Sequence, residues 1–127
     1  MSQAVARNIS VKVDTSYVPG RSAPHKNVYF FSYHVTIRNN GKEPVQLLTR
    51  HWTITDATGR TEEVRGAGVV GEQPMLRPGE HFEYTSFCPL STQVGRMHGC
   101  YEMVTETGGR FDVLVAPFTL SLPHAMN

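Results

Sequence analysis

The sequence has few cysteines, no long hydrophobic run and no excess of charge of either sign. Two cysteines, Cys88 and Cys100, are too few for a disulfide framework, and we expect both to be reduced thiols. No apolar run is long enough to span a bilayer, and the first residues lack the apolar core of a secretory signal, so we expect a cytoplasmic protein with no membrane partner. Twelve Lys and Arg are scattered among eleven Asp and Glu, which argues against a nucleic-acid groove.

What is present fits one folded domain. Of the 127 residues, 39% are hydrophobic and 18% are charged, which is typical of a chain that buries a core. We expect a single domain over residues 1–127, with its core between residues 5 and 123 and short flexible ends.

Short alternations of apolar and polar residues recur along the chain and predict β-strands. Turns rich in Gly, Pro and Asn separate them roughly every ten residues, and no amphipathic helix is visible. The apolar alternation changes phase at Ala116 and Pro117, which predicts a bulge in the last strand. The pattern indicates an all-β fold, an antiparallel β-sandwich of about seven strands. The expected strands cover residues 9–14, 28–38, 46–56, 61–65, 81–85, 97–103 and 111–122.

A glycine string lies between two of these strands. Its members, Gly66, Gly68 and Gly71, match the G-x-G-x-x-G fingerprint of dinucleotide-binding turns. That turn must open a helix, but two prolines and a glycine in residues 72–79 exclude an ordinary helix. Two interpretations stay open. The glycines serve tight turns, so that Gly68→Val would disturb the loop, or they form an anion-binding nest assisted by Arg65 and Arg77.

A second candidate region is Arg50-His51-Trp52. Trp52 lies on the apolar side of its strand, so we expect a core residue. Arg50 shares that side, and we expect it near the strand end, with its stem on apolar surface and its head in water. His51 points to the other face. We take Arg50 and His51 as a candidate interaction surface, since arginine is favoured at interfaces.

No established catalytic or metal-binding spacing is present. The histidines lack H-x-x-x-H spacing, the cysteines lack C-x-x-C spacing, and no serine lies in a G-x-S-x-G elbow. We expect no catalytic activity, no cofactor and no dedicated metal site. Strand pairing could still gather polar-face residues around a divalent cation. The residues concerned are His34, His51, His81, His98, Glu83, Glu102 and Asp112.

Four stretches together resemble the ApaG family, the DUF525 domain. They are NNGKEPVQLLTRHW, RGAGVVGEQP, RPGEHFEYTS and FDVLVAPF, and the resemblance runs from about residue 5 to residue 123. It implies a fibronectin type III-like or immunoglobulin-like sandwich. The family's bacterial members are small cytoplasmic proteins whose gene neighbours that of a diadenosine tetraphosphate hydrolase, and the family is linked to cobalt and magnesium efflux.

The resemblance implies a role but no catalytic residue. In eukaryotes such domains are attached to an F-box protein and to a protein that interacts with DNA polymerase delta, where they look like interaction modules. We therefore expect a non-catalytic module that binds an unknown protein partner. Two alternatives are kept: binding of a nucleotide or diadenosine polyphosphate through the glycine string, and divalent-metal binding.

Overall fold

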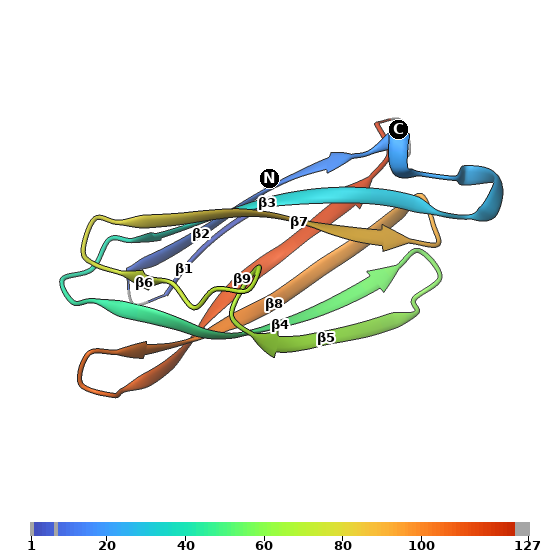
Figure 1. Ribbon diagram of the computed structural model, residues 1–127. Helices are drawn as coiled ribbons and strands as arrows, with labels where there is room; N and C mark the ends of the chain where they lie inside the picture. The colour runs from blue at the N-terminus through green and yellow to red at the C-terminus, as the bar shows by residue number, and fades with distance from the viewer. Residues whose placement is uncertain (1, 7, 124–127) are drawn as a thin grey trace.

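The computed structural model describes residues 2–6 and 8–123, with side chains from residue 8 onward, and it consists of two packed antiparallel sheets (Figure 1). The first sheet has the order β1-β2-β3-β7, with β1 Ser2–Ala6, β2 Ile9–Tyr17, β3 Tyr29–Asn39 and β7 His81–Leu90. The second has the order β5-β4-β8-β9, with β4 Val45–Asp56, β5 Thr61–Ala67, β8 Val94–Thr105 and β9 Arg110–Ser121. The short strand β6 (Met75–Leu76) pairs with β4. Two single turns of 3-10 helix, η1 (Pro19–Arg21) and η2 (Pro24–Lys26), join β2 to β3.

The expected all-β antiparallel sandwich is confirmed, and each of the seven expected strands is present. Two strands were not expected. β6 has only two residues, too few to give a pattern, and β1 pairs with β2 where the sequence predicts a flexible end. The loose tail expected near the other end falls largely on residues 124–127, outside the described part of the chain. Within the described residues, no helix combines the length and apolar character of a membrane span.

The core lies between the sheets. It consists of the apolar residues that the predicted alternations place on the inward side of each strand. Trp52 is 3% exposed, which confirms it as a core residue. Its ring lies 5.7, 5.9 and 5.8 Å from the ring centroids of Tyr33, Tyr101 and Phe118, and each contact is edge-on. Such edge-to-face contacts stabilise a packed aromatic cluster. The fully buried side chains include Ile9, Val11, Val13, Phe31, Val35, Ile37, Leu47, Met97, Tyr101, Met103 and Leu120.

The predicted bulge in the last strand is confirmed. Met97 of β8 pairs with Phe118 of β9, but Gly99 pairs with Val115. Two residues of β9, Ala116 and Pro117, therefore stand opposite a single residue of β8. The extra residue changes the phase of the alternation, so that residues before and after Pro117 both direct apolar side chains into the core.

The two cysteines are free thiols in different sheets. Cys88 lies buried on β7, and its burial raises the pKa of the thiol to about 11. Cys100 is half-buried on β8, opposite His51 of β4. Neither thiol has the lowered pKa that marks a reactive cysteine.

The two sides of the sandwich are closed differently. On one side β1 and β2 contact β9. On the other side the edge strands are β7 and β5. Because β8 occupies one edge of β4, β5 and β6 both lie along its other edge. Residues 68–74 join β5 to β6 and cross the side between the two sheets (Figure 1).

Candidate functional site

The glycine string forms a tight hairpin. The N–H of Val69 donates to the carbonyl oxygen of Glu72 at 2.8 Å, and the N–H of Glu72 donates to that of Val69 at 2.9 Å. The two residues between them, Val70 and Gly71, have φ values of 44° and 81°. Two successive positive φ angles define a type I′ turn. We call residues 68–72 the glycine hairpin.

The turn places a strained residue at its tip. A positive φ is unusual for a β-branched side chain and costs about 1–2 kcal/mol. Val70 nevertheless adopts it and is 54% exposed, whereas its neighbour Val69 is fully buried in the core. The buried Val69 anchors the hairpin on the sandwich and leaves Val70 at the surface.

The hairpin uses much of its own hydrogen-bonding capacity. The N–H groups of Val69 and Glu72 are bonded within it, and the N–H of Gly68 donates to the carbonyl oxygen of Leu48 at 2.8 Å. Three amides that a nest would present to an anion are therefore engaged elsewhere. Anion binding by the glycine string itself stays a prediction.

Arg50 packs beneath the hairpin. Its Nη1 donates to the carbonyl oxygens of Ala67 and Gly68, at 3.1 and 2.9 Å. The sequence places Arg50 near a strand end, and this is wrong: Arg50 lies in the middle of β4, half-buried, opposite Gly66 of β5. The reason is that Gly66 has no side chain, so the guanidinium can lie 2.8–2.9 Å from the place that a Cβ would take.

The other proposed site residues do not join Arg50. Arg65 and His51 lie on the outer face of the second sheet, where both approach Glu63, at 3.6 and 2.8 Å. Arg50 and His51 therefore point to opposite faces and do not form one patch. Arg77 lies after β6, and its backbone N–H donates to Oε1 of Glu80 at 2.7 Å.

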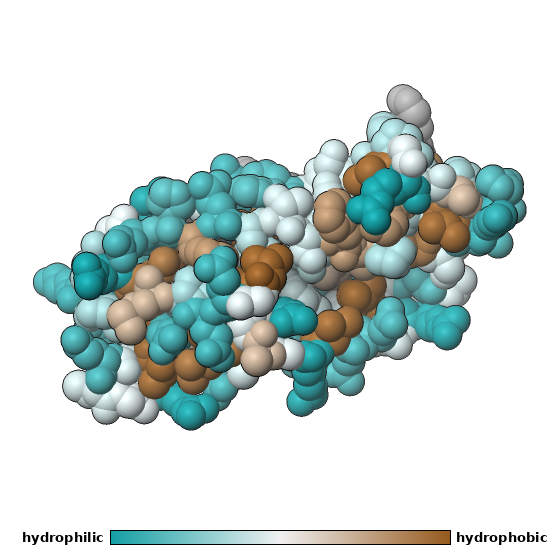
Figure 2. Space-filling view, in the orientation of Figure 1, coloured by the Kyte–Doolittle hydropathy of each residue, from teal (hydrophilic) through white to brown (hydrophobic). Residues whose placement is uncertain are grey.

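A small cavity of about 180 Å³ lies under the glycine hairpin. It sits on the side of the molecule that residues 68–74 cross, where Figure 2 shows hydrophobic residues among polar ones. Strands of both sheets and the hairpin contribute to its wall, so the cavity exists only in the folded sandwich. Its lining residues are Tyr33, Arg50, Trp52, Val69, Val70, Gly71, Tyr84 and Ser86.

The polar side chains of this cavity include neutral hydroxyl groups and one cation, the guanidinium of Arg50. Burial raises the pKa of Tyr33 and of Tyr84 above that of an ordinary tyrosine, so both hydroxyls stay protonated. The Tyr84 hydroxyl shares a hydrogen bond with that of Tyr101. Nε1 of Trp52 is buried and has no hydrogen-bond partner among the described residues. A buried unsatisfied donor is rare and calls for an explanation.

Sequence reasoning missed the hydroxyl groups of this cavity. The alternation correctly turns Tyr33 and Tyr84 inward. It gives no sign that Ser86 joins them beside Arg50, because that depends on the path of the hairpin over the edge of the sandwich.

Three histidines lie beside carboxylates, and two of the three share Glu83. On the outer face of the first sheet, Nε2 of His34 lies 2.9 Å from Oε1 of Glu83, and Nε2 of His81 lies 3.1 Å from Oε2. Hydrogen bonds from His34 and then His81 lower the pKa of Glu83. Across the described residues, no group of three or more His, Cys, Asp or Glu side chains is arranged to hold a metal ion.

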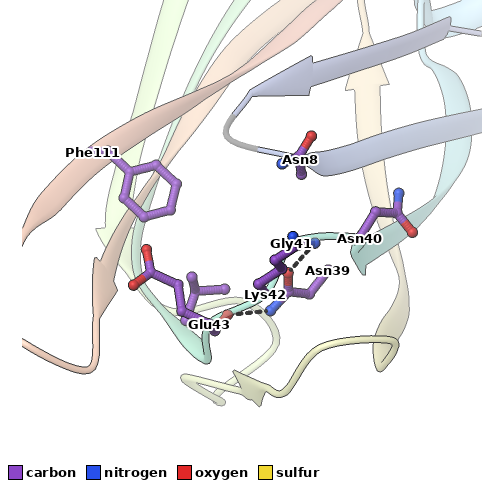
Figure 3. A pocket seen from close by; sticks show the side chains of 8 residues that line it. Asn8, Asn39, Asn40, Gly41, Lys42, Glu43 and Phe111 are labelled. Carbon is purple, nitrogen blue, oxygen red and sulfur yellow. Dashed lines mark hydrogen bonds between the residues drawn. The ribbon is translucent and has the colours of Figure 1, made fainter.

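A larger cavity of about 500 Å³ lies at the turn between β3 and β4 (Figure 3). Asn39 lines this cavity and is almost fully buried. Its Nδ2 donates to the carbonyl oxygens of Glu43 and Leu76, both at 2.9 Å, and its Oδ1 accepts from the N–H of Gly41. Since both amide hydrogens are engaged, one by the turn and one by β6, Asn39 holds the turn to the sandwich and has no donor left for a ligand.

The fold and the glycine hairpin define a small antiparallel β-sandwich with a loop packed over one open side. Residues 19–105 match the description of the ApaG domain, DUF525. The chain is 57% identical to Protein ApaG of Rhodopseudomonas palustris over 124 residues, covering 98% of this chain and 95% of the relative. It is 47% identical to Protein ApaG of Aromatoleum aromaticum over 127 residues, which is the full length of both. The chain belongs to the ApaG family.

A solved structure agrees with this assignment. The Bordetella pertussis protein described as ApaA superposes with a TM-score of 0.91 at 49% sequence identity, covering 95% of this chain and 98% of that one. The names of these relatives indicate no catalytic function.

Proposed function

We propose that the chain is a non-catalytic cytoplasmic module that binds a protein partner along β5. The observation that carries this proposal is the free edge of that strand. Within residues 2–6 and 8–123, β5 pairs with β4 alone, and of its seven residues only Gly66 is even partly buried. A strand without proline whose outer edge is unpaired is a template for an extended segment of a partner, bound by main-chain hydrogen bonds.

Exposed apolar side chains accompany this edge. Val64 on β5 is 37% exposed, and Val70 at the tip of the glycine hairpin is 54% exposed. Apolar groups beside a free edge are what recognition of a partner strand requires, because they supply the contacts that alternate side chains of the partner make.

The charges of β5 set the specificity of this edge. The exposed Val64 is flanked in the sequence by charged residues, Glu62 and Glu63 before it and Arg65 after it. Charged side chains on an edge strand suppress indiscriminate pairing with other strands. They favour a partner whose charges are complementary, which affects the rate and specificity of association more than its strength.

A photo-crosslinking amino acid at position 64 tests the proposal in the native cell. The same amino acid at position 114 is the matched control, because Leu114 is also an exposed apolar residue of the second sheet but lies on β9. We expect a discrete crosslinked protein from position 64 that is absent, or much weaker, from position 114. Equal and diffuse crosslinking from both positions would contradict the proposal.

The alternatives are separated by an amide chemical-shift titration of the labelled protein. ATP and diadenosine tetraphosphate test nucleotide binding by the glycine string, and Mg²⁺ and Co²⁺ test metal binding at the histidines. We expect no saturable shift of residues 66–71 with either nucleotide, and none of the histidines with either metal. In this proposal, the family's association with cobalt and magnesium efflux operates through the protein partner.

A further inference from the structure

We propose that the cavity beneath the glycine hairpin binds a single carboxylate group. This site is separate from the outer edge of β5 and stands whether or not that edge binds a partner. The donors at its wall are Arg50 and the hydroxyls of Tyr33 and Ser86, and the indole of Trp52 lines the same cavity.

The first argument is the charge of Arg50. An arginine stays protonated at any physiological pH. Both hydrogen bonds that fix Arg50 start from Nη1 and end on neutral carbonyl oxygens. Within the described part of the chain, none of the carboxylates that form ion pairs does so with Arg50. A half-buried charge without a counter-ion is costly, so the site favours an anionic ligand.

The second argument is the unsatisfied donor. Trp52 lines the cavity and is 3% exposed, and its Nε1 has no hydrogen-bond partner among the described residues. An indole N–H can only donate, so its missing partner must be an acceptor. Tyr33 and Ser86 place two further hydroxyls at the same cavity, and burial raises the pKa of Tyr33. A carboxylate has two oxygens with about four acceptor sites, which matches one cation and several neutral donors.

The third argument separates a carboxylate from a phosphate. The cavity contains one cation, Arg50, and the rest of its lining is uncharged. A doubly charged phosphate would leave a net negative charge in a cavity with no second cation, which is unfavourable. A carboxylate is flat and singly charged and pairs with the two-pronged edge of a guanidinium. The volume of about 180 Å³ equals that of roughly six water molecules, enough for a carboxylate on a short carbon chain.

Two sources of the carboxylate share this chemistry: a free small organic acid, and the C-terminus or an acidic side chain of a bound peptide. Binding can be followed at the indole N–H of Trp52. The chain has one tryptophan, so this group gives a single resonance in a nitrogen–proton correlation spectrum.

We would titrate labelled protein with acetate and propionate, and with acetamide as the neutral control at matched ionic strength. Two short peptides that contain no Asp or Glu, identical but for a free or amidated C-terminus, form the second arm, and inorganic phosphate forms the third.

We expect a saturable shift of the Trp52 indole proton with a carboxylate, because Trp52 lines the cavity. Saturation by acetate or propionate identifies a free acid as sufficient. Saturation only by the peptide with the free C-terminus identifies a partner's carboxylate. A shift of equal size with acetamide, tighter binding of phosphate, or a resonance unmoved by every carboxylate overturns the proposal.

Three variants complete the test. Ser86→Val fills the cavity without changing charge, and Arg50→Lys keeps the charge but loses the two-pronged edge. Each should weaken binding about tenfold or more, as expected when a hydrogen bond to a charged group is lost. Arg65→Gln removes an exposed arginine on the outer face and should leave the affinity within about twofold. Unchanged affinity in Ser86→Val, with its folded spectrum intact, would place the ligand outside the cavity and contradict the proposal.

Discussion

Gly66 and Arg50 stand opposite each other in the pairing of β5 with β4, and a Cβ at Gly66 would lie 2.8 Å from Nη1 of Arg50. The guanidinium fills the space that a side chain would take. From there it donates to two carbonyl oxygens of the chain entering the glycine hairpin. The first glycine of the string therefore serves the packing of an arginine.

The first prediction concerns this contact. In Gly66→Ala the guanidinium must shift, because all three atoms nearest the new Cβ belong to it. The arginine is flexible, so we expect a loss of roughly 1 kcal/mol in the free energy of unfolding, of the order of one hydrogen bond. Amide shifts at residues 67–69 should change clearly. Gly20→Ala is the control, since a Cβ there meets no atom within 4 Å. Unchanged shifts at 67–69 would show that Arg50 does not hold the hairpin.

The second prediction compares two glycines with positive φ. Gly71→Ala introduces only backbone strain, because its φ is 81° and no atom lies within 4 Å of the new Cβ. We expect a cost of about 1–2 kcal/mol. Gly68 has a φ of 64°, and a Cβ there overlaps the carbonyl oxygen of Glu72. Gly68→Ala should therefore cost more, and Gly68→Val more again. Chemical denaturation measures all three. Equal stability of Gly68→Val and the wild type, with unchanged backbone shifts, would count against this role of Gly68.

The third prediction concerns the buried hydrogen bond between the hydroxyls of Tyr84 and Tyr101. Tyr84→Phe and Tyr101→Phe each leave one buried hydroxyl without its partner, and we expect a cost of roughly 1–3 kcal/mol for each. The double variant removes both hydroxyls and should cost less than the sum of the two. A double-mutant cycle of unfolding free energies measures the difference. Strict additivity would indicate that the two hydroxyls do not depend on each other.

The fourth prediction concerns pH. A hydrogen bond from His34 is the largest cause of the lowered pKa of Glu83. Because the pKa is lower in the folded protein, the stabilisation is present above the ordinary glutamate pKa and is lost as the pH falls through the lowered value. His34→Gln should raise the pKa of Glu83 toward the ordinary value. Carbon-detected carboxyl titration measures this shift.

The same titration contains its own reference. A hydrogen bond from His51 lowers the pKa of Glu63 on the other sheet. That pKa should not move in His34→Gln. A pKa of Glu83 that also stays unchanged would show that His34 is not its main partner in solution.

Much of the fold follows from the sequence, for a physical reason. Strands packed on one face alternate with a period of two, so residues such as Val11 and Trp52 reveal which side is buried. Even the bulge at Pro117 leaves a visible change of phase. β1 and β6 were missed because pairing at an edge and a two-residue strand leave little pattern of their own.

The candidate site was only partly predictable. The glycine string marks the hairpin correctly, since positive φ angles at Gly68 and Gly71 need glycine. Sequence separation misled the choice of arginines. Arg65 and Arg77 lie closer in sequence to the string, but pairing of β4 with β5 brings Arg50 to it. Long-range strand register decides such contacts, and register cannot be determined from a single strand's pattern.

The most direct test of the proposed function is amide hydrogen exchange of β5 in labelled protein, compared between buffer and native cell extract. The amides of residues 61–67 that β4 does not bond should be protected when a partner strand adds to the edge. We predict that extract slows their exchange at least about tenfold, the effect of some 1.4 kcal/mol of binding, and that Val64→Lys abolishes the slowing. Exchange along β5 that is identical in extract and in buffer, with protection appearing on another surface, would contradict the account.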